Sequence, residues 1–473
     1  MPERGRCKLR LRERWFGDKA FYRRVLAIAL PILVQNTITN IVNMADNVMV
    51  GLLGTDPMNG VAIVNQLLFV FNISIFGGVS GAGIFGAQYF GREDYEGMRD
   101  TFRFKLVCCA LIAALGLGLF LFWDTPLISL FLHEGSQTGD IAATLAYAKD
   151  YLGIMLFGLA PFALSQSYAS TLREAGRTTV PMNASTIAVV LDTALSFVLI
   201  YGKLGFPALG VRGAALATVT ARFVECIIMV WWTHAHEDIC LFAMGLYKKL
   251  TIPWPLARNI LLRGTPLLVN EMLWSLGMTV LAQCYSLRGL ASVAAYNITA
   301  TVTNLFNVVH FAIGGSIAII VGNLLGAGKM EEARRTDTRL IVFSVLASLG
   351  VAAGMAAASP LFPMIYNTTD EVHSLARDFL LISAMTLPLH AFLHAAYYTL
   401  RSGGKTVLTF IFDSGFIWAA CIPVAWILAR YTSLPIRPLY ALVQAVDVLK
   451  CLLGYLFVRS DIWLNNIVAE QGG

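Results

Sequence analysis

The sequence contains twelve apolar stretches of 18 or more residues, and these stretches constrain the fold more than any other feature. Each is long enough to cross a hydrocarbon core about 30 Å thick as an α-helix. Apolar residues make up 57% of the chain and charged residues 14%, whereas soluble domains average roughly 45 to 50% and about 25%. The sequence therefore predicts an all-α integral membrane protein with twelve transmembrane helices, near residues 25–51, 61–87, 104–123, 141–171, 179–201, 209–233, 257–283, 292–323, 336–358, 372–400, 406–429 and 439–458.

The basic residues of the connections predict the topology. Both termini and every second connection carry twenty-six Lys and Arg, nine of them in residues 1–24, whereas the alternate connections carry five. By the positive-inside rule, this bias places both termini in the cytoplasm. The net charge of +6 follows from the same bias, so no nucleic-acid partner is expected.

The polar stretch 234–256 divides the apolar stretches into two sets of six, which an internal repeat relates. An offset of 235 residues aligns YFGREDYEGMRDT at 89–101 with LLGAGKMEEARRT at 324–336, and an offset of 228 aligns LREAGRT at 172–178 with LRSGGKT at 400–406. Because six is even, both halves enter the membrane from the same side, and the repeat is parallel. Transporters built from two such halves bind substrate between them near the midplane. The expected parts are a cytoplasmic N-terminal segment (1–24), two six-helix bundles (25–233 and 257–459), a cytoplasmic linker (234–256) and a cytoplasmic tail (460–473).

The first apolar stretch carries a polar stripe around a carboxylate, Asp46. At 100° per residue, the polar residues of this stretch fall within an arc of about 120°. Interhelical hydrogen bonds, worth only about 0.6 kcal/mol each in membranes, are one interpretation of the amides. Hydrogen bonds of this strength do not offset the cost of placing Asp46 in the membrane, because a charge at the bilayer centre costs about 2.5 to 3.5 kcal/mol. A proton or cation is therefore expected to complete a site along the stripe, which comprises Asn36, Thr39, Asn40, Asn43, Asp46 and Asn47.

Several motifs resemble those of the multidrug and toxic compound extrusion (MATE) family, in its bacterial NorM-like branch. They occur in the family's order between roughly residues 20 and 460: ALPILVQN, VNMADNVMVGLLG, SGAGIFGAQYFGRED, LREAGRTTVPM, GVRGAALATVTAR and VNEMLWSLG. The resemblance implies two six-helix bundles forming a V, which exchange Na⁺ or H⁺ against amphiphilic, often cationic, drug-like compounds by alternating access. It also implies a monomer in the bacterial inner membrane that is not an enzyme and needs no cofactor besides the coupling ion.

The resemblance implies a cation-coupling site around Asp46, with Asn43 on the same helix face. Asp192, Ser196 and Thr218 occupy positions where similar proteins place polar groups around this acid. Many relatives carry Asn in place of Asp192, so the expected pocket holds two carboxylates. Two acids close together do not both ionise cheaply, and either a shared proton or a hard cation held by oxygen ligands relieves the pair. The sequence leaves Na⁺ and H⁺ open.

The second half places its acid elsewhere. Glu271 aligns with Asn36, whereas Leu281 stands at the position equivalent to Asp46. Relatives with an acidic second-half site often add an Asp where this chain has His390. Because an imidazole titrates near about 6.5, His390 and His394 favour a proton relay over a Na⁺ site. Histidines hydrogen-bonded within the bundle are the alternative interpretation, and a transition-metal site that also uses His310 is a weaker one.

The remaining charged groups inside the spans are expected to be structural. Arg222 with Glu225 and Asp447 with Lys450 are spaced i, i+3, which predicts neutralised pairs near the cytoplasmic face. Asp413 is expected to be either a buried cap or a gate contact.

The substrate-cavity candidates are Asn36, Asn40, Trp274 and Met278. Aromatic and Met side chains suit flat lipophilic cations, although most of them pack or face lipid in the alternative interpretation. A lipid-linked saccharide flippase is the second function considered, but flippases present several cationic residues to a pyrophosphate, and the first-half interior here is acidic. A membrane-embedded enzyme is the third, and the sequence contains no DDxxD or HxxxD cluster in a sensible context.

Overall fold

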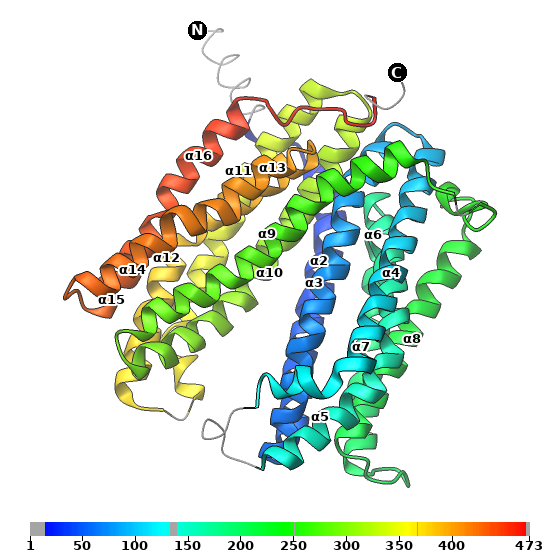
Figure 1. Ribbon diagram of the computed structural model, residues 1–473. Helices are drawn as coiled ribbons and strands as arrows, with labels where there is room; N and C mark the ends of the chain where they lie inside the picture. The colour runs from blue at the N-terminus through cyan, green and yellow to red at the C-terminus, as the bar shows by residue number, and fades with distance from the viewer. Residues whose placement is uncertain (1–14, 133–139, 250, 367, 470–473) are drawn as a thin grey trace. The chain divides into compact units, whose positions relative to one another are not determined.

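The computed structural model describes residues 15–132, 140–249, 251–366 and 368–469, and the regular structure of these residues is helical (Figure 1). Twelve of its helical segments are long and apolar enough to cross a membrane, as predicted. The first six spans are α2 (Lys19–Gly51), α3 (Thr55–Gly91), α4 (Tyr95–Ser129), α5 (Ile141–Met155) with α6 (Leu159–Glu174), α7 (Thr179–Tyr201) and α8 (Val211–Ala235). The last six are α9 (Trp254–Ser286), α10 (Leu290–Gly326), α11 (Met330–Ala358), α12 (Asp370–Ser402), α13 (Thr406–Phe410) with α14 (Ile422–Tyr431), and α15 (Ile436–Ala445) with α16 (Asp447–Arg459).

The helices form two compact units. Unit 1 comprises Met1–Leu33, Ala87–Glu93 and Leu261–Gly473, and unit 2 comprises Val34–Gly86 and Asp94–Ile260. Helices α2, α3 and α9 therefore contribute residues to both units. The domain boundaries expected from the sequence stay a prediction, and the parts of the expected termini at 1–14 and 470–473 lie outside the described residues.

Two glycines that the repeat aligns allow α3 and α10 to approach closely in unit 1. A Cβ on Gly91, at the end of α3, would lie 1.9 Å from the carbonyl O of Asn323. A Cβ on Gly326, at the end of α10, would lie 1.8 Å from the carbonyl O of Gln88. The 235-residue offset relates both the two glycines and the two amides, so the contact is reciprocal. Any side chain at either glycine would push the two helix ends apart.

The segment that follows α16 packs into unit 1. Trp463 is 1% exposed and Ile467 is 1% exposed, so the expected tail contributes to the core. The Gln88 amide holds the segment, because its Nε2 donates to Asn465 O at 3.1 Å and its Oε1 accepts from Ile467 N at 2.9 Å. A buried amide with both ends satisfied fixes the backbone of its partners.

The stretch after α8 packs against α4 within unit 2. Arg103 of α4 donates from Nε to Leu246 O at 2.9 Å and from Nη2 to Gly245 O at 3.0 Å. These charge-assisted bonds satisfy two carbonyls of the stretch. Burial raises the pKa of the Cys240 thiol to about 11, so that thiol stays protonated at neutral pH.

Candidate cation-coupling and substrate sites

Two carboxyl groups come together inside the helices of unit 2. Asp46 lies on α2 and Asp192 on α7, close enough for their charges to repel each other. The Thr218 and Ser196 hydroxyls lie near Asp192, and Thr218 Oγ1 donates to Ala214 O of its own helix at 3.2 Å. In the part of the chain that the structure describes, Oδ1 of Asp46 and Oδ1 of Asp192 are buried and have no hydrogen-bond partner. Since an unpaired buried oxygen is costly, a bound proton or cation fits this pair.

The asparagine face of α2 is open. Asn40 and Asn43 are exposed, and Asn36 is half-buried. Among the described residues none of these amides forms a hydrogen bond, whereas Thr39 Oγ1 donates to Gln35 O of its own helix at 2.9 Å. The interpretation that interhelical hydrogen bonds use up this face is therefore wrong. Asn43 makes no hydrogen bond to either acid and is free to contact a ligand.

Sequence reasoning missed two members of the acidic site. Tyr151 of α5 lies within electrostatic range of both Asp46 and Asp192, and Arg222 of α8 lies within range of Asp192. The Arg222 guanidinium lies over the Phe162 ring at 4.9 Å from its centroid. The sequence did contain a signal for Arg222. It lies one helical turn after Thr218, and side chains at i and i+4 share a helix face, so Arg222 is directed to the same site as Thr218.

The expected Arg222–Glu225 pair does not form, so that prediction is wrong. Arg222 Nη1 donates to Gly158 O at 3.4 Å, and the Ser185 hydroxyl donates to Glu225 Oε1. Both side chains therefore have hydrogen-bond partners outside α8.

Unit 1 holds a second cluster of charged and polar side chains, contributed by α9, α10, α12, α16 and a π-helical segment, Ile411–Gly415. Wide π turns occur mostly as single interruptions of α-helices, and this one carries Asp413. Lys450 Nζ donates to Asp413 Oδ1 at 2.8 Å, and Asn270 Nδ2 donates to Asp413 Oδ2 at 3.0 Å. Ser414 Oγ donates to Asn270 O at 2.7 Å. Asp413 is thus the anion of a buried ion pair, with both carboxylate oxygens occupied.

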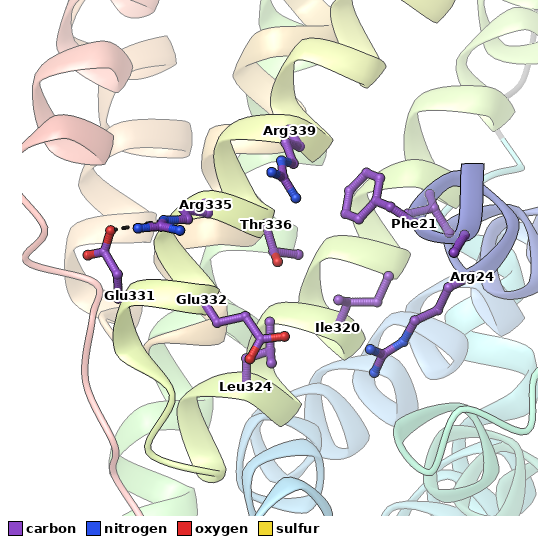
Figure 2. A pocket seen from close by; sticks show the side chains of 11 residues that line it. Phe21, Arg24, Ile320, Leu324, Glu331, Glu332, Arg335, Thr336 and Arg339 are labelled. Atoms are coloured by element: carbon purple, nitrogen blue, oxygen red, sulfur yellow. Dashed lines mark hydrogen bonds and ion pairs between the residues drawn. The ribbon is translucent and has the colours of Figure 1, made fainter. Parts of the chain in front are cut away.

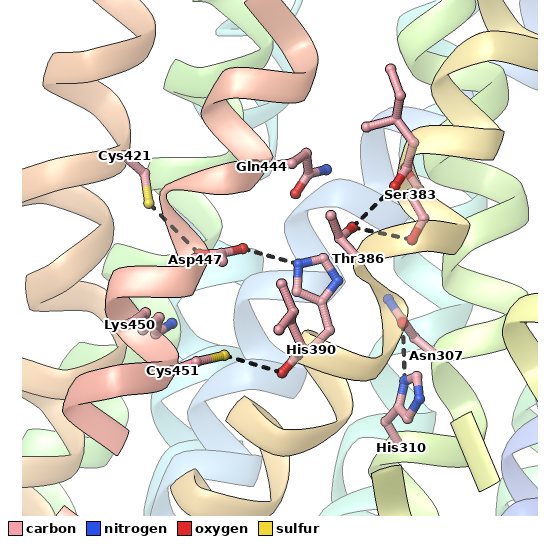
Figure 3. A network of polar contacts seen from close by, with 12 residues as sticks. Asn307, His310, Ser383, Thr386, His390, Cys421, Gln444, Asp447, Lys450 and Cys451 are labelled. Atoms are coloured by element: carbon pink, nitrogen blue, oxygen red, sulfur yellow. Dashed lines mark hydrogen bonds and ion pairs between the residues drawn. The ribbon is translucent and has the colours of Figure 1, made fainter. Parts of the chain in front are cut away.

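The histidines occupy the same cluster. Figure 3 shows His390 of α12 directed toward Asp447 of α16, with an Nε2–Oδ2 distance of 2.9 Å. His394 stacks on His310 with centroids 6.2 Å apart. His310 Nδ1 lies 3.3 Å from Asn307 Oδ1, and its Nε2 is buried without a hydrogen-bond partner among the described residues.

One sequence expectation for this cluster is wrong. Asp447 and Lys450 do not pair with each other, because Asp413 binds Lys450 and His390 binds Asp447. No group of three His, Cys, Asp or Glu in the described residues is arranged to hold a metal ion. Glu271 lies beside these pairs and accepts a hydrogen bond from Tyr397 OH at 3.3 Å.

The two halves of the expected substrate cavity belong to different units. Asn36 and Asn40 are in unit 2, and Trp274 and Met278 are in unit 1. Trp274 is 39% exposed, whereas Met278 packs against the core around α9 and α10. Phe71 of α3 is 5% exposed and packs in the unit 2 core, as the alternative interpretation of the aromatic residues expects.

The sequence model of the MatE family matches residues 31–198 and 266–427, which is more than half of the chain. The chain belongs to the MATE family. The prediction from the motifs is confirmed, and so is the prediction of a transporter rather than an enzyme, because MATE proteins are multidrug transporters.

MATE proteins similar to this chain match most of its length. The probable multidrug resistance protein NorM of Thermotoga maritima is 26% identical over 95% of this chain and 94% of its own. The probable multidrug resistance protein YoeA of Bacillus subtilis is 23% identical over 93% and 94%. A crystal structure of MATE in the bent conformation matches with a TM-score of 0.82 at 18% identity, covering 93% and 95%. At that identity the structural likeness establishes the MATE fold.

Unit 1 also contains a cavity of about 500 Å³. Figure 2 shows Arg24 and Phe21 of α2 on one side of it and the first turns of α11 on the other. Arg335 pairs with Glu331 at 3.2 Å at its edge. None of the predicted site residues of this MATE protein lines it, so it is separate from the two sites above. Its lining residues are Ala20, Phe21, Arg24, Val25, Ile320, Leu324, Glu331, Glu332, Arg335, Thr336 and Arg339.

Proposed function

We propose that this chain is a secondary active exporter of amphiphilic, drug-like cations, driven by entry of one monovalent cation at the Asp46–Asp192 site. The observation that carries the proposal is the pair of buried carboxyl oxygens without hydrogen-bond partners. The names of the relatives, probable multidrug resistance proteins, support a drug-like substrate. The open asparagine face of α2 offers amides to such a substrate beside the acids.

The charges around the acids support a single monovalent ion. Asp46 and Asp192 lie with Arg222, and Glu225 lies within electrostatic range of both Arg222 and Arg173. Three acids and two guanidinium groups leave one negative charge. One H⁺, one Na⁺ or one cationic substrate neutralises it, so coupling ion and substrate compete for the same charge. Such competition produces exchange when the two sides of the membrane are exposed alternately.

We further propose the orientation of the chain, the membrane it occupies and its oligomeric state. The basic residues of the termini and of every second connection support a cytoplasmic location for both ends. The bacterial relatives support the inner membrane. The chain is proposed to act as a monomer, because each proposed site is built within one chain.

The test is dye efflux from inverted vesicles under either an imposed pH gradient or an imposed Na⁺ gradient. Asp46→Asn and Asp192→Asn are expected to lose gradient-driven efflux at least tenfold, because an amide carries no exchangeable charge. Glu96→Gln, which removes an exposed acid of the same unit, is the matched control and is expected to behave as wild type. Retained gradient-driven exchange in Asp46→Asn would refute the coupling role, and the effective gradient identifies the ion.

A further inference from the structure

The cavity of about 500 Å³ in unit 1 lies where three spans begin or end. Its lining residues come from the start of α2, the end of α10 and the start of α11. The apolar stretches of these spans begin or end at residues 25, 323 and 336, so the cavity lies at the level of the lipid headgroups. We propose that it binds the phosphodiester headgroup of an anionic phospholipid. This binding goes beyond the proposed export and does not depend on it.

The charge of the cavity matches a single phosphodiester. Arg24 of α2 lines one side, and Arg335 and Arg339 of α11 line the other (Figure 2). Glu331 and Glu332 also line it, which leaves one positive charge in excess. A phosphodiester carries one negative charge at neutral pH, and the guanidinium fork binds its two free oxygens through parallel hydrogen bonds. Basic pockets between transmembrane helices on the cytoplasmic side bind anionic headgroups in this way.

The two carboxylates have basic partners outside the lining, whereas one guanidinium is available. Glu331 Oε2 accepts from Arg334 Nη1 at 3.1 Å, and Glu332 Oε2 lies 3.8 Å from Lys329 Nζ. Arg24 is exposed and forms no hydrogen bond or ion pair among the described residues. An anion in the cavity therefore does not have to displace an existing partner of Arg24.

Two further side chains complete the polar part of the lining. The Arg339 guanidinium lies over the Phe21 ring at 5.8 Å from its centroid, so α2 and α11 are in contact beside the cavity. Thr336 is 8% exposed, and its hydroxyl forms no hydrogen bond in the part of the chain that the structure describes. This hydroxyl offers a donor to a phosphate oxygen between the two helices.

The surface of α11 beyond the arginines favours a lipid over free phosphate as the source of the headgroup. Because α11 begins at Met330, outside its apolar stretch, later residues of the helix lie deeper in the bilayer. Val342 is half-buried and Leu346 is 48% exposed. These two side chains follow Arg335 and Arg339 at i, i+4, i+7 and i+11, so the four share one helix face. A headgroup at the arginines can thus lay an acyl chain along an apolar strip.

The experiment counts phospholipid molecules bound to the purified full-length protein by native mass spectrometry during a lipid titration. Phosphatidylglycerol is the anionic probe and phosphatidylcholine the zwitterionic one. The tightest position is expected to hold one phosphatidylglycerol and to bind phosphatidylcholine about tenfold more weakly, because the choline group brings a cation beside the guanidinium groups.

Three variants locate that position. Arg24→Gln loses a charge-assisted hydrogen bond and is expected to weaken phosphatidylglycerol binding about tenfold. Arg23→Gln removes the neighbouring exposed arginine, which does not line the cavity, and is the matched control expected to behave as wild type. Glu332→Gln raises the positive charge of the cavity and is expected to strengthen binding about threefold.

Equal losses in Arg24→Gln and Arg23→Gln, or no loss in either, would overturn the proposal, because a basic helix end attracts anionic lipid without a built site. Excess inorganic phosphate or glycerol 3-phosphate is expected not to displace the lipid, and displacement by either would assign the cavity to free phosphate instead. Circular dichroism checks folding, and Arg24→Lys, which keeps the charge without the fork, is expected to show a smaller loss than Arg24→Gln. Because no efflux is measured, failure of the Asp46→Asn test leaves this result unchanged.

Discussion

The two units place different chemistry at positions that the repeat makes equivalent. The 235-residue offset relates Gln35 to Asn270, and both are buried amides that hold a neighbouring helix. In unit 2 the Gln35 amide donates to the Ser185 hydroxyl and accepts from Arg173, and in unit 1 the position equivalent to Ser185 is Asp413. The same position thus carries a hydroxyl in unit 2 and a carboxylate paired with Lys450 in unit 1.

The two units also differ in how their buried basic residues are paired. The 228-residue offset relates Arg222 to Lys450 and Phe162 to His390. Arg222 lies over Phe162 in unit 2, and in unit 1 Lys450 binds an acid while the equivalent of the phenyl ring is an imidazole. Unit 2 leaves one oxygen of Asp46 and one of Asp192 without a hydrogen-bond partner, whereas Asp413 in unit 1 has partners on both oxygens. The ion site proposed for unit 2 therefore depends on what neighbouring helices present to an acid, and not on the position of the acid alone.

The largest effect is expected from breaking the Lys450–Asp413 ion pair of unit 1. Lys450→Met leaves Asp413 buried without its counter-charge, which costs about 3 to 5 kcal/mol of folding free energy. Asp413→Ser combined with Lys450→Met installs the residue that unit 2 has at the equivalent position and is expected to recover most of the loss. Thermal unfolding in detergent measures both. A double variant as unstable as Lys450→Met would show that the two units are not interchangeable at this position.

The next effect tests the reciprocal packing of the two repeat glycines. Gly91→Ala and Gly326→Ala each place a Cβ against a backbone carbonyl and are expected to cost about 1 to 3 kcal/mol, by similar amounts. Gly350→Ala is the control, because its Cβ meets nothing within 4 Å and the helix gains roughly 0.5 to 1 kcal/mol. Unfolding temperatures provide the measurement, and a loss confined to one of the two repeat glycines would contradict the reciprocity.

A smaller effect is expected from changing the net charge around Asp192 in unit 2. Arg222→Gln raises the net negative charge around Asp192 and is expected to strengthen binding of a probe, the lipophilic cation tetraphenylphosphonium, about tenfold, which is about 1.4 kcal/mol. Arg212→Gln removes an exposed guanidinium of the same helix, paired with Asp150, and serves as the control. Equilibrium binding of the probe decides the matter, and weaker binding to Arg222→Gln would assign the guanidinium to substrate contact instead.

The smallest effect concerns the open amides of α2. Asn40→Ala removes one hydrogen-bonding group and is expected to weaken probe binding by about 0.5 to 1.5 kcal/mol. Because Asn40 is exposed and makes no hydrogen bond within the described protein, stability is expected to change by less than about 0.5 kcal/mol. The same binding and unfolding measurements check it, and a large loss of stability would show that the amide has a structural role.

The sequence predicted the spans because apolar length is a local property. A stretch such as 61–87 must cover the hydrocarbon core wherever it lies, so no tertiary information is needed. The sequence also predicted that Asp46 and Asp192 would share one site, through the resemblance to the MATE family. The structure brings them within electrostatic range.

The two wrong ion-pair predictions have the same cause. Arg222–Glu225 and Asp447–Lys450 were paired on sequence spacing, yet each side chain found a partner on another helix. Spacing along a helix reports which face a residue occupies but says nothing about what a neighbouring helix presents to that face.

The amino-acid sequence by itself determined the membrane class, the number of spans, the repeat and the acids that enter the bilayer, because hydropathy and periodicity act within single helices. The tertiary structure decided which of those acids stay unpaired. Neutralising a buried charge requires a group within a few ångströms, and in this protein that group comes from another helical segment, as Asp413 does for Lys450.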